Sequence, residues 1–165
     1  MATKTIDVTL AAMRNAGDNV VSPHGAISAR TVRAVDDEQV FQSELLYWRP
    51  RSQQPMHPNG AVHIAPGESL TYNTTKRLTV SHFEREAEGQ LNQMLIFASD
   101  LTQDVVLLGQ VHPDERYQGS FNRKLRFDEI DGLNVVSCDY NVVFGGGFWA
   151  KIIVTYVVNL VSSSG

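Results

Sequence analysis

Apolar residues recur mainly at every second position, and this spacing constrains the fold more than any other feature of the sequence. The pattern is clearest in residues 150–161, where two faces alternate. One face is wholly apolar: Ala150, Ile152, Val154, Tyr156, Val158 and Leu160. The other is mixed: Lys151, Ile153, Thr155, Val157, Asn159 and Val161. Because side chains alternate between the faces of a strand, this segment predicts a strand that buries its apolar face.

Glycines at positions 145–147 precede this strand and raise two other interpretations. A phosphate-binding loop needs a helix after its glycines, since helix N–H groups hold the phosphate, but a β-branched run follows here. A membrane-spanning barrel strand also alternates, but Asp139 interrupts the segment that would form its hairpin partner. We therefore expect the glycines to form a bend or bulge at the start of a core strand.

The same spacing predicts about nine or ten short strands with turn residues between them and no regular helices. Residues 5–12 and 27–35 are the first two predicted strands, and the proline-rich residues 49–60 are the longest predicted loop. Strands without crossover helices pair in antiparallel fashion. We expect an antiparallel β-sandwich of about eight to ten strands, jelly-roll or C2-like, as a single domain over residues 1–161. Residues 162–165 are predicted to form a disordered tail.

Charge and cysteine content exclude several classes of protein. The 165 residues carry a net charge of −4 and no block of Lys and Arg, which argues against nucleic-acid binding. The only cysteine, Cys138, cannot form an internal disulfide. The sequence shows no signal-peptide pattern and no apolar run of about 18 residues. We expect a cytoplasmic protein, or one exported without a recognisable signal peptide.

The sequence contains no clear catalytic motif. Cys138 could act as a nucleophile with His82 or His112 as its base, but a single cysteine within a strand typically behaves as a small buried hydrophobe. His57 and His63 lack the short spacing of zinc or iron ligands, and the paired-histidine motif of cupin-like jelly rolls is missing. We therefore expect no enzymatic activity.

Acidic residues in two predicted loops suggest a calcium site. Asp18 follows the first predicted strand, and Asp100 and Asp104 lie within the segment SDLTQD. Residues 95–111 resemble the strand, acidic loop and strand with a Leu-Gly exit of C2 domains, and residues 5–15 resemble their first strand and calcium loop. The resemblance implies calcium held by loops against anionic lipid, although the family's closely spaced aspartates are not present here. The alternative is that these aspartates only shape turns.

Two aromatic groups are candidate partner-binding residues. Tyr, Trp and Arg are enriched where partners dock, and Tyr and Trp also stack on sugars or lie at membrane surfaces. The alternative is that the aromatic rings pack in the core while the arginines are solvated. The candidates are Tyr47, Trp48, Arg49 and Arg51 before the long loop, and Phe148 and Trp149 after the glycines.

These observations predict a non-catalytic interaction module, such as an adaptor, a lectin-like domain or a self-assembling subunit. Its partner would be a protein or a carbohydrate. We also expect a homo-oligomer, because Ile153, Val157 and Val161 make the mixed face of the last strand more apolar than a solvated edge. The alternative is a membrane-active β protein that binds lipid with calcium or forms an oligomeric pore. No cofactor other than calcium is expected.

Overall fold

A computed structural model describes residues 2–49, 63–82, 89–91, 94–96, 102–112, 119–131, 133–144 and 147–165. Ten strands are described. The first sheet contains, in spatial order, β4 (Ser69–His82), β1 (Ala2–Asn15), β10 (Gly147–Ser164) and β9 (Leu133–Phe144). The second sheet contains β3 (Asp36–Arg49), β2 (His24–Arg33), β7 (Gln103–His112) and β8 (Ser120–Leu125). A third, two-stranded sheet pairs β5 (Gly89–Leu91) with β6 (Met94–Ile96).

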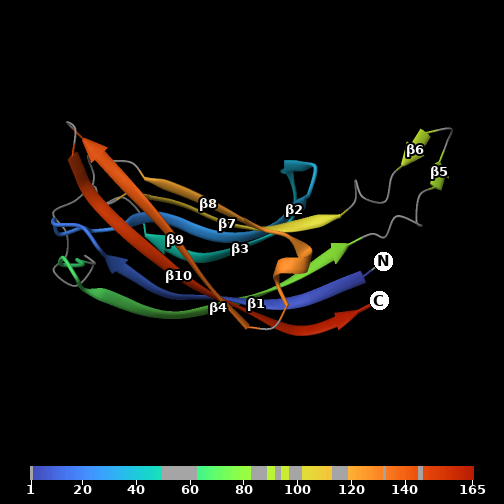
Figure 1. The fold of residues 1–165 in the computed structure, drawn as a ribbon, viewed down its shortest axis with the longest axis horizontal. Coiled ribbons are helices and arrows are strands. Elements are labelled where there is room, and N and C mark those ends of the chain that lie inside the picture. Colours follow the sequence, from blue (N-terminus) through green and yellow to red (C-terminus); the bar gives the residue numbers. More distant parts are fainter. Residues whose placement is uncertain are drawn as a thin grey trace.

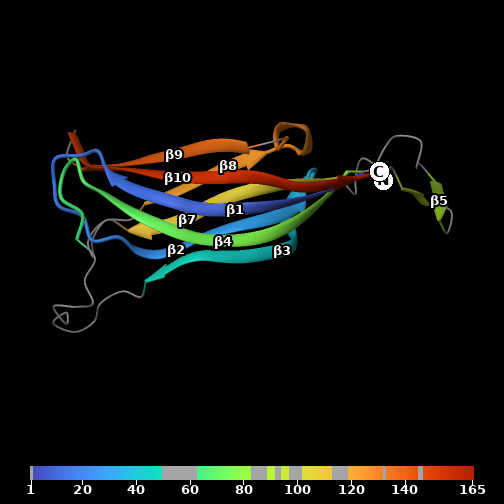
Figure 2. The ribbon, with the colours of Figure 1, turned by 90° about the horizontal axis from the view of Figure 1, so that it is seen from below.

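The two four-stranded sheets form the layers of an antiparallel sandwich (Figure 1), which confirms the predicted fold class. The chain crosses between the layers after β1, after the β2–β3 hairpin, after β4 and after the β7–β8 hairpin, and it closes with the β9–β10 hairpin. A short 3-10 helix, η3 (Phe127–Glu129), lies between β8 and β9. The two ends of the chain lie together at one end of the sandwich (Figures 1 and 2).

The core lies between the sheets and consists of the inward faces predicted from the alternating pattern. In β10, the predicted apolar face is buried from Ala150 to Val158, and Leu160 packs against its margin. The strand is not at an edge, however, because β1 and β9 pair with its two sides. Self-association through an edge of β10 is therefore excluded, whereas self-association through its mixed outward face stays a prediction.

A β-bulge shifts the inward face of β1. The register of β1 against both neighbours changes between Leu10 and Ala12. Ile6, Val8 and Leu10 are buried as the alternation predicts, but beyond the bulge Met13 replaces Ala12 in the core. An extra residue in a strand reverses which side chains face inward, and this shift is not visible in a simple period of two.

Two glycines allow close contacts in the second sheet. Gly25 has φ +120°, and a Cβ at this position would lie 2.0 Å from the carbonyl oxygen of Gln110. At Gly109, a Cβ would lie 2.3 Å from Cε1 of Phe121, whose ring occupies that space. Because neither glycine has a side chain, the Gln110 carbonyl can approach Gly25 closely, and the Phe121 ring can pack over Gly109.

The last residues of the chain continue β10. This strand extends to Ser164, where the sequence predicted a disordered tail from residue 162. Thr3, Lys4 and Thr5 of β1 pair with Ser164, Ser163 and Ser162 respectively. The pairing corrects the predicted boundary, because an adjacent strand supplies hydrogen-bonding partners that a serine-rich sequence does not reveal.

Candidate interaction surface

Tyr47 and Trp48 are neighbours on β3 but point in opposite directions. Tyr47 is buried, its hydroxyl donates a hydrogen bond to the carbonyl of Pro23 at 2.8 Å, and its ring contacts Tyr72 edge to face. Burial, and then the nearby Tyr72, raise the pKa of Tyr47, while Arg49 opposes the rise. Tyr47 therefore anchors β3 to the core, and of these two neighbours only Trp48, 61% exposed, is available to a partner.

A register shift in β3 explains why Trp48 is exposed. Ile27 of β2 pairs with Tyr47, whereas the next residue, Ser28, pairs with Leu45, so that Leu46 is an extra residue. In a strand without this bulge, side chains would alternate strictly between the two faces. Trp48 would then lie on the inward face together with Gln42 and Glu44. β-Bulges commonly re-aim a side chain in this way.

A second shift near Phe41 turns Val40 outward, whereas Phe41 already shares the outward face of Ser43 and Leu45 by alternation. Thr31 pairs with Gln42 and Val32 with Val40, which leaves Phe41 between them. The outer side of β3 consequently carries four exposed apolar side chains, here called the β3 apolar row. These are Val40, Phe41, Leu45 and Trp48. Sequence reasoning found only Trp48, because Val40, Phe41 and Leu45 resemble ordinary core residues of a strand.

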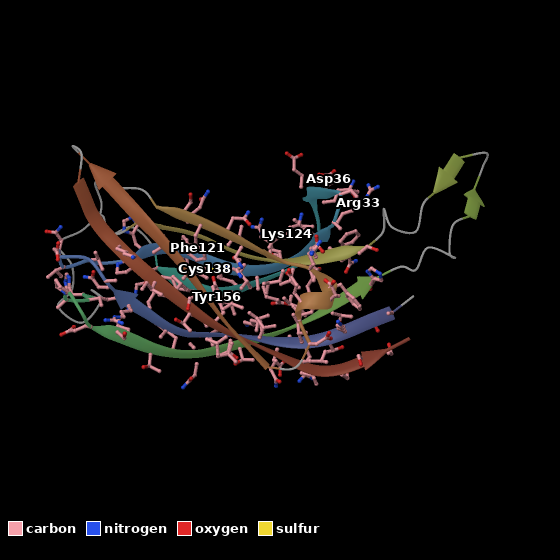
Figure 3. The ribbon with its side chains drawn as sticks, in the orientation of Figure 1. Arg33, Asp36, Phe121, Lys124, Cys138 and Tyr156 are labelled. Carbon is pink, nitrogen blue, oxygen red and sulfur yellow. The ribbon has the colours of Figure 1, made fainter. Side chains whose placement is uncertain are left out.

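The charges along β3 are unevenly distributed. Asp36 and Glu38 lie at the end nearer the β2–β3 turn, where the Glu38 N–H donates a hydrogen bond to Oδ1 of Asp36 at 3.1 Å. Arg33 also lies at this end and donates to Gln39 at 3.3 Å (Figure 3 shows Arg33 and Asp36 at the turn). The opposite end of β3 is Arg49, which pairs with Gly25. The end nearer the turn therefore carries charges of both signs, and the side chain of Arg49 at the other end interacts with the inward Tyr47.

The neighbouring edge strand, β4, is covered by side chains of the second sheet. The Gln42 amide donates to the Arg77 carbonyl at 2.9 Å and accepts from the Thr79 N–H at 3.2 Å. The Ser81 N–H donates to Oε1 of Gln103 at 3.2 Å. These contacts satisfy backbone groups that an edge strand would otherwise offer to another chain.

The outer face of the first sheet is largely polar along β1 and β4. Thr9 and Thr75 share a hydrogen bond of 2.8 Å between their hydroxyls, and Arg77 forms a bidentate pair with Asp7. Val135 and Val161 are exposed on this sheet, but they lie on β9 and near the end of β10 and form no row along one strand. The contrast makes the β3 apolar row the strongest candidate for a partner surface among the described residues.

The predicted calcium ligands do not converge. Asp18 is exposed in the connection between β1 and β2. Asp104 is buried on β7, pairs with Val32 near the far end of β2, and forms an ion pair with Lys124 at 3.5 Å. Asp18 and Asp104 therefore lie at opposite ends of the sandwich, and Asp100 lies outside the described residues. No group of three or more metal-ligating side chains occurs in the described part of the chain.

Cys138 does not face either of the histidines proposed as its base. Cys138 is buried on the inward side of β9. Burial of Tyr156 raises the pKa of this tyrosine, and the nearby Cys138 raises it further. Figure 3 shows Cys138, Tyr156 and Phe121 in the middle of the sandwich. His82 pairs with Ala2 at the end where the chain termini meet, and the backbone of His112 pairs with His24 at the opposite end. This placement agrees with a structural role for the cysteine.

The remaining candidate residues are placed only in part. Phe148 and Trp149 lie at the start of β10, whose register against β9 shifts between Phe148 and Ala150. The bend or bulge predicted at the glycines involves Gly145 and Gly146, which lie outside the described residues. This start lies at the same end of the sandwich as Arg49, but on the other sheet (Figure 2). Arg51 lies outside the described residues.

Comparisons with models of known protein families, with curated proteins and with solved structures gave no match. Across the part of the chain that the structure describes, no helix has the length and apolar character needed to cross a bilayer.

Proposed function

We propose that this chain is a non-catalytic interaction module that binds a protein partner through the β3 apolar row. The supporting observation is the exposure of Val40, Phe41, Leu45 and Trp48 on one strand, each more than 40% accessible. Full exposure of a large apolar side chain costs about 1.5–3 kcal/mol relative to burial, and because these side chains are about half exposed, a partner would recover about half of this per residue. The core placement of Tyr47 holds this strand firmly against the sandwich.

The composition of the row favours a protein over a carbohydrate or a membrane. Sugars are held by stacking on aromatic rings, whereas Val40 and Leu45 are aliphatic. Anionic lipid attracts basic surfaces, whereas Asp36 and Glu38 flank one end of the row. Protein interfaces combine aromatic and aliphatic side chains with charged residues at the rim, as this strand does.

A photo-crosslinking amino acid placed at position 45 tests the proposed function. The matched control carries the same amino acid at Thr75, an exposed position on the outer face of the first sheet. Both proteins are irradiated alone and in an extract of the producing cell. Protein adducts from position 45 and not from position 75 support the row as a docking surface, and equal yields from both positions in both samples contradict it.

Glycan binding and liposome cosedimentation, with and without calcium, test the other two partner classes. If the chain binds a glycan or liposomes and the Trp48→Ala variant loses that binding, the partner of the β3 apolar row is that ligand and not a protein. Unchanged binding in the variant would place that ligand elsewhere on the chain.

A further inference from the structure

We infer that two copies of this chain join through β9, with their β9 strands side by side and antiparallel, so that the first sheet continues from one copy into the other. The inference goes beyond the proposed function, because β9 lies in a different sheet from the β3 apolar row. It rests on a comparison of the four edge strands of the sandwich. Among the residues that the structure describes, β9 alone presents a long, regular edge without cover.

β9 is the last strand of the first sheet. β10 pairs with one side of β9, and no described strand pairs with the other side (Figure 2 shows β9 along the margin of the molecule). The pairing with β10 covers residues 133–142 of β9 without a register shift. Successive residues of a strand point their N–H and C=O groups to alternate sides, so about every second residue here directs both groups away from β10. These groups form a regular row that fits another strand.

The sequence of β9 lacks the features that usually keep an edge strand from pairing. Exposed edges are typically short, bulged, or marked by lysine or proline. β9 has 12 residues, of which Asp139 is the only charged one, and it contains no lysine, arginine or proline. Val135 is 68% exposed, and Ser137 is exposed on the same face. A long strand with several valines and one charge attracts another strand unless something covers its edge.

The other three edge strands of the two large sheets are each protected. Side chains of Gln42 and Gln103 bond to the backbone of β4. Register shifts interrupt β3, so it offers only short regular stretches. β8 has 6 residues and exposes Arg123 and Lys124. Among the strands described in these two sheets, β9 is therefore the edge available for regular pairing.

The occupant that fits this edge is β9 of a second copy. A strand that adds to β9 needs a free, regular edge of its own, and β9 itself has one. When two identical edges pair in antiparallel fashion, a two-fold axis perpendicular to the sheet relates them, and one contact covers both edges. A foreign strand would cover the edge of this chain but leave its own second edge open. Pairing between two copies leaves neither β9 edge uncovered.

The regular stretch and its single charge place the axis near Ser137. This residue lies at the middle of residues 133–142, so an axis there pairs most of the stretch. Residues opposite each other in an antiparallel pair share a face, and Asp139 of each copy would lie opposite Val135 of the other. An axis at Asp139 would instead place two aspartates opposite each other, which is unfavourable.

Two substitutions of Val135 test the contact and its register. Sedimentation equilibrium of the full chain should show a dimer for wild type. Val135→Glu places a second carboxylate opposite Asp139 at both symmetric contacts and should raise the dimer dissociation constant about tenfold. Val135→Lys places an opposite charge there and should keep the constant within about threefold of wild type. Thr75→Glu and Thr75→Lys, at an exposed position on β4 of the same sheet, are the matched controls and should not change dimerisation.

Hydrogen exchange of the backbone amides measures the β9 edge directly. In wild type, the β9 amides that point away from β10 should become protected as the protein concentration rises, because they then donate to the second copy. In Val135→Glu at the same concentration, these amides should exchange rapidly. The amides of β1, which pairs on both sides, serve as the internal control and should stay protected throughout. Circular dichroism and the urea midpoint verify that every variant folds.

Three results would overturn the inference. The first is a monomeric wild-type chain, and the second is equal weakening of the dimer by glutamate and lysine at position 135. The third is a dimer in which exchange of the β9 amides does not depend on concentration, because its contact would lie on another surface. The proposed function is tested separately, since position 45 lies on β3 in the other sheet and its crosslinks do not require β9.

Discussion

The side-chain amide of Gln42 joins the edges of the two sheets by bonding to both the N–H of Thr79 and the carbonyl of Arg77. The amide thereby takes the place that a neighbouring strand would occupy along this part of β4. The same β3 strand carries the apolar row on its outer side. One strand thus protects an edge with its inward side and presents a candidate docking surface with its outward side.

Replacement of Gln42 by alanine should weaken the fold and expose the β4 edge. Loss of the two backbone contacts should lower the free energy of unfolding by about 1–2 kcal/mol, measured by urea denaturation. Aggregation, followed by thioflavin binding, should also rise because the Thr79 N–H becomes available to another chain. Asn122→Ala, at an exposed position on β8, is the control. Equal behaviour of the two variants would show that Gln42 does not protect the edge.

Replacement of Asn15 should destabilise the end of the sandwich that holds the β1–β2 connection. Asn15 is fully buried, its Nδ2 donates to the carbonyls of Asn19 at 2.6 Å and Ile64 at 2.9 Å, and its Oδ1 accepts from the Gly17 N–H at 3.0 Å. Asn15→Ala should lower the free energy of unfolding by about 2–4 kcal/mol, because buried backbone groups lose their partners.

Asp18→Ala is the control for Asn15 and also tests the predicted calcium site. Asp18 is exposed in the same connection, so its removal should change the unfolding free energy by less than about 0.5 kcal/mol. The result should be the same with calcium and with chelator. Calcium-dependent stabilisation that disappears in this variant would restore a calcium site at Asp18.

Gly109→Ala should destabilise the protein through a clash with Phe121. The new Cβ would lie 2.3 Å from the ring, and forcing extra volume into a packed site typically costs about 1–3 kcal/mol. Phe121→Ala should relieve this clash, so the double variant should lose less stability than the sum of the single variants. Additive losses in urea denaturation would place the cost of the alanine outside the contact with Phe121.

Tyr156 should make stability fall at alkaline pH. Burial, and then Cys138, raise the pKa of Tyr156, so its phenol stays neutral in the folded chain. In the unfolded chain a tyrosine ionises near pH 10, so the stabilisation is complete below about pH 10 and is lost as the pH rises, at about 1.4 kcal/mol per pH unit. Tyr156→Phe removes the one proton that this tyrosine releases on unfolding, so the slope of the unfolding free energy against pH should be shallower by about 1.4 kcal/mol per pH unit. Identical slopes for wild type and variant above pH 10 would contradict this prediction.

The sequence by itself determined the fold class and most of the inward face of each long strand. Ile6, Val8 and Leu10 in β1, and the apolar face of β10, follow from alternation because a strand exposes successive side chains to opposite sides. The antiparallel arrangement follows from the absence of crossover helices between strands. Both inferences depend only on local geometry.

Tertiary structure decided the order of the strands and the location of the candidate surface. Nothing in β10 itself indicates that β1 and β9 pair with both of its sides, since edge and interior strands share the same spacing. Likewise, the exposure of Val40 and Trp48 depends on bulges that appear only when β3 is aligned with β2. An inserted residue reverses the direction of every following side chain, and only the partner strand reveals where the insertion lies.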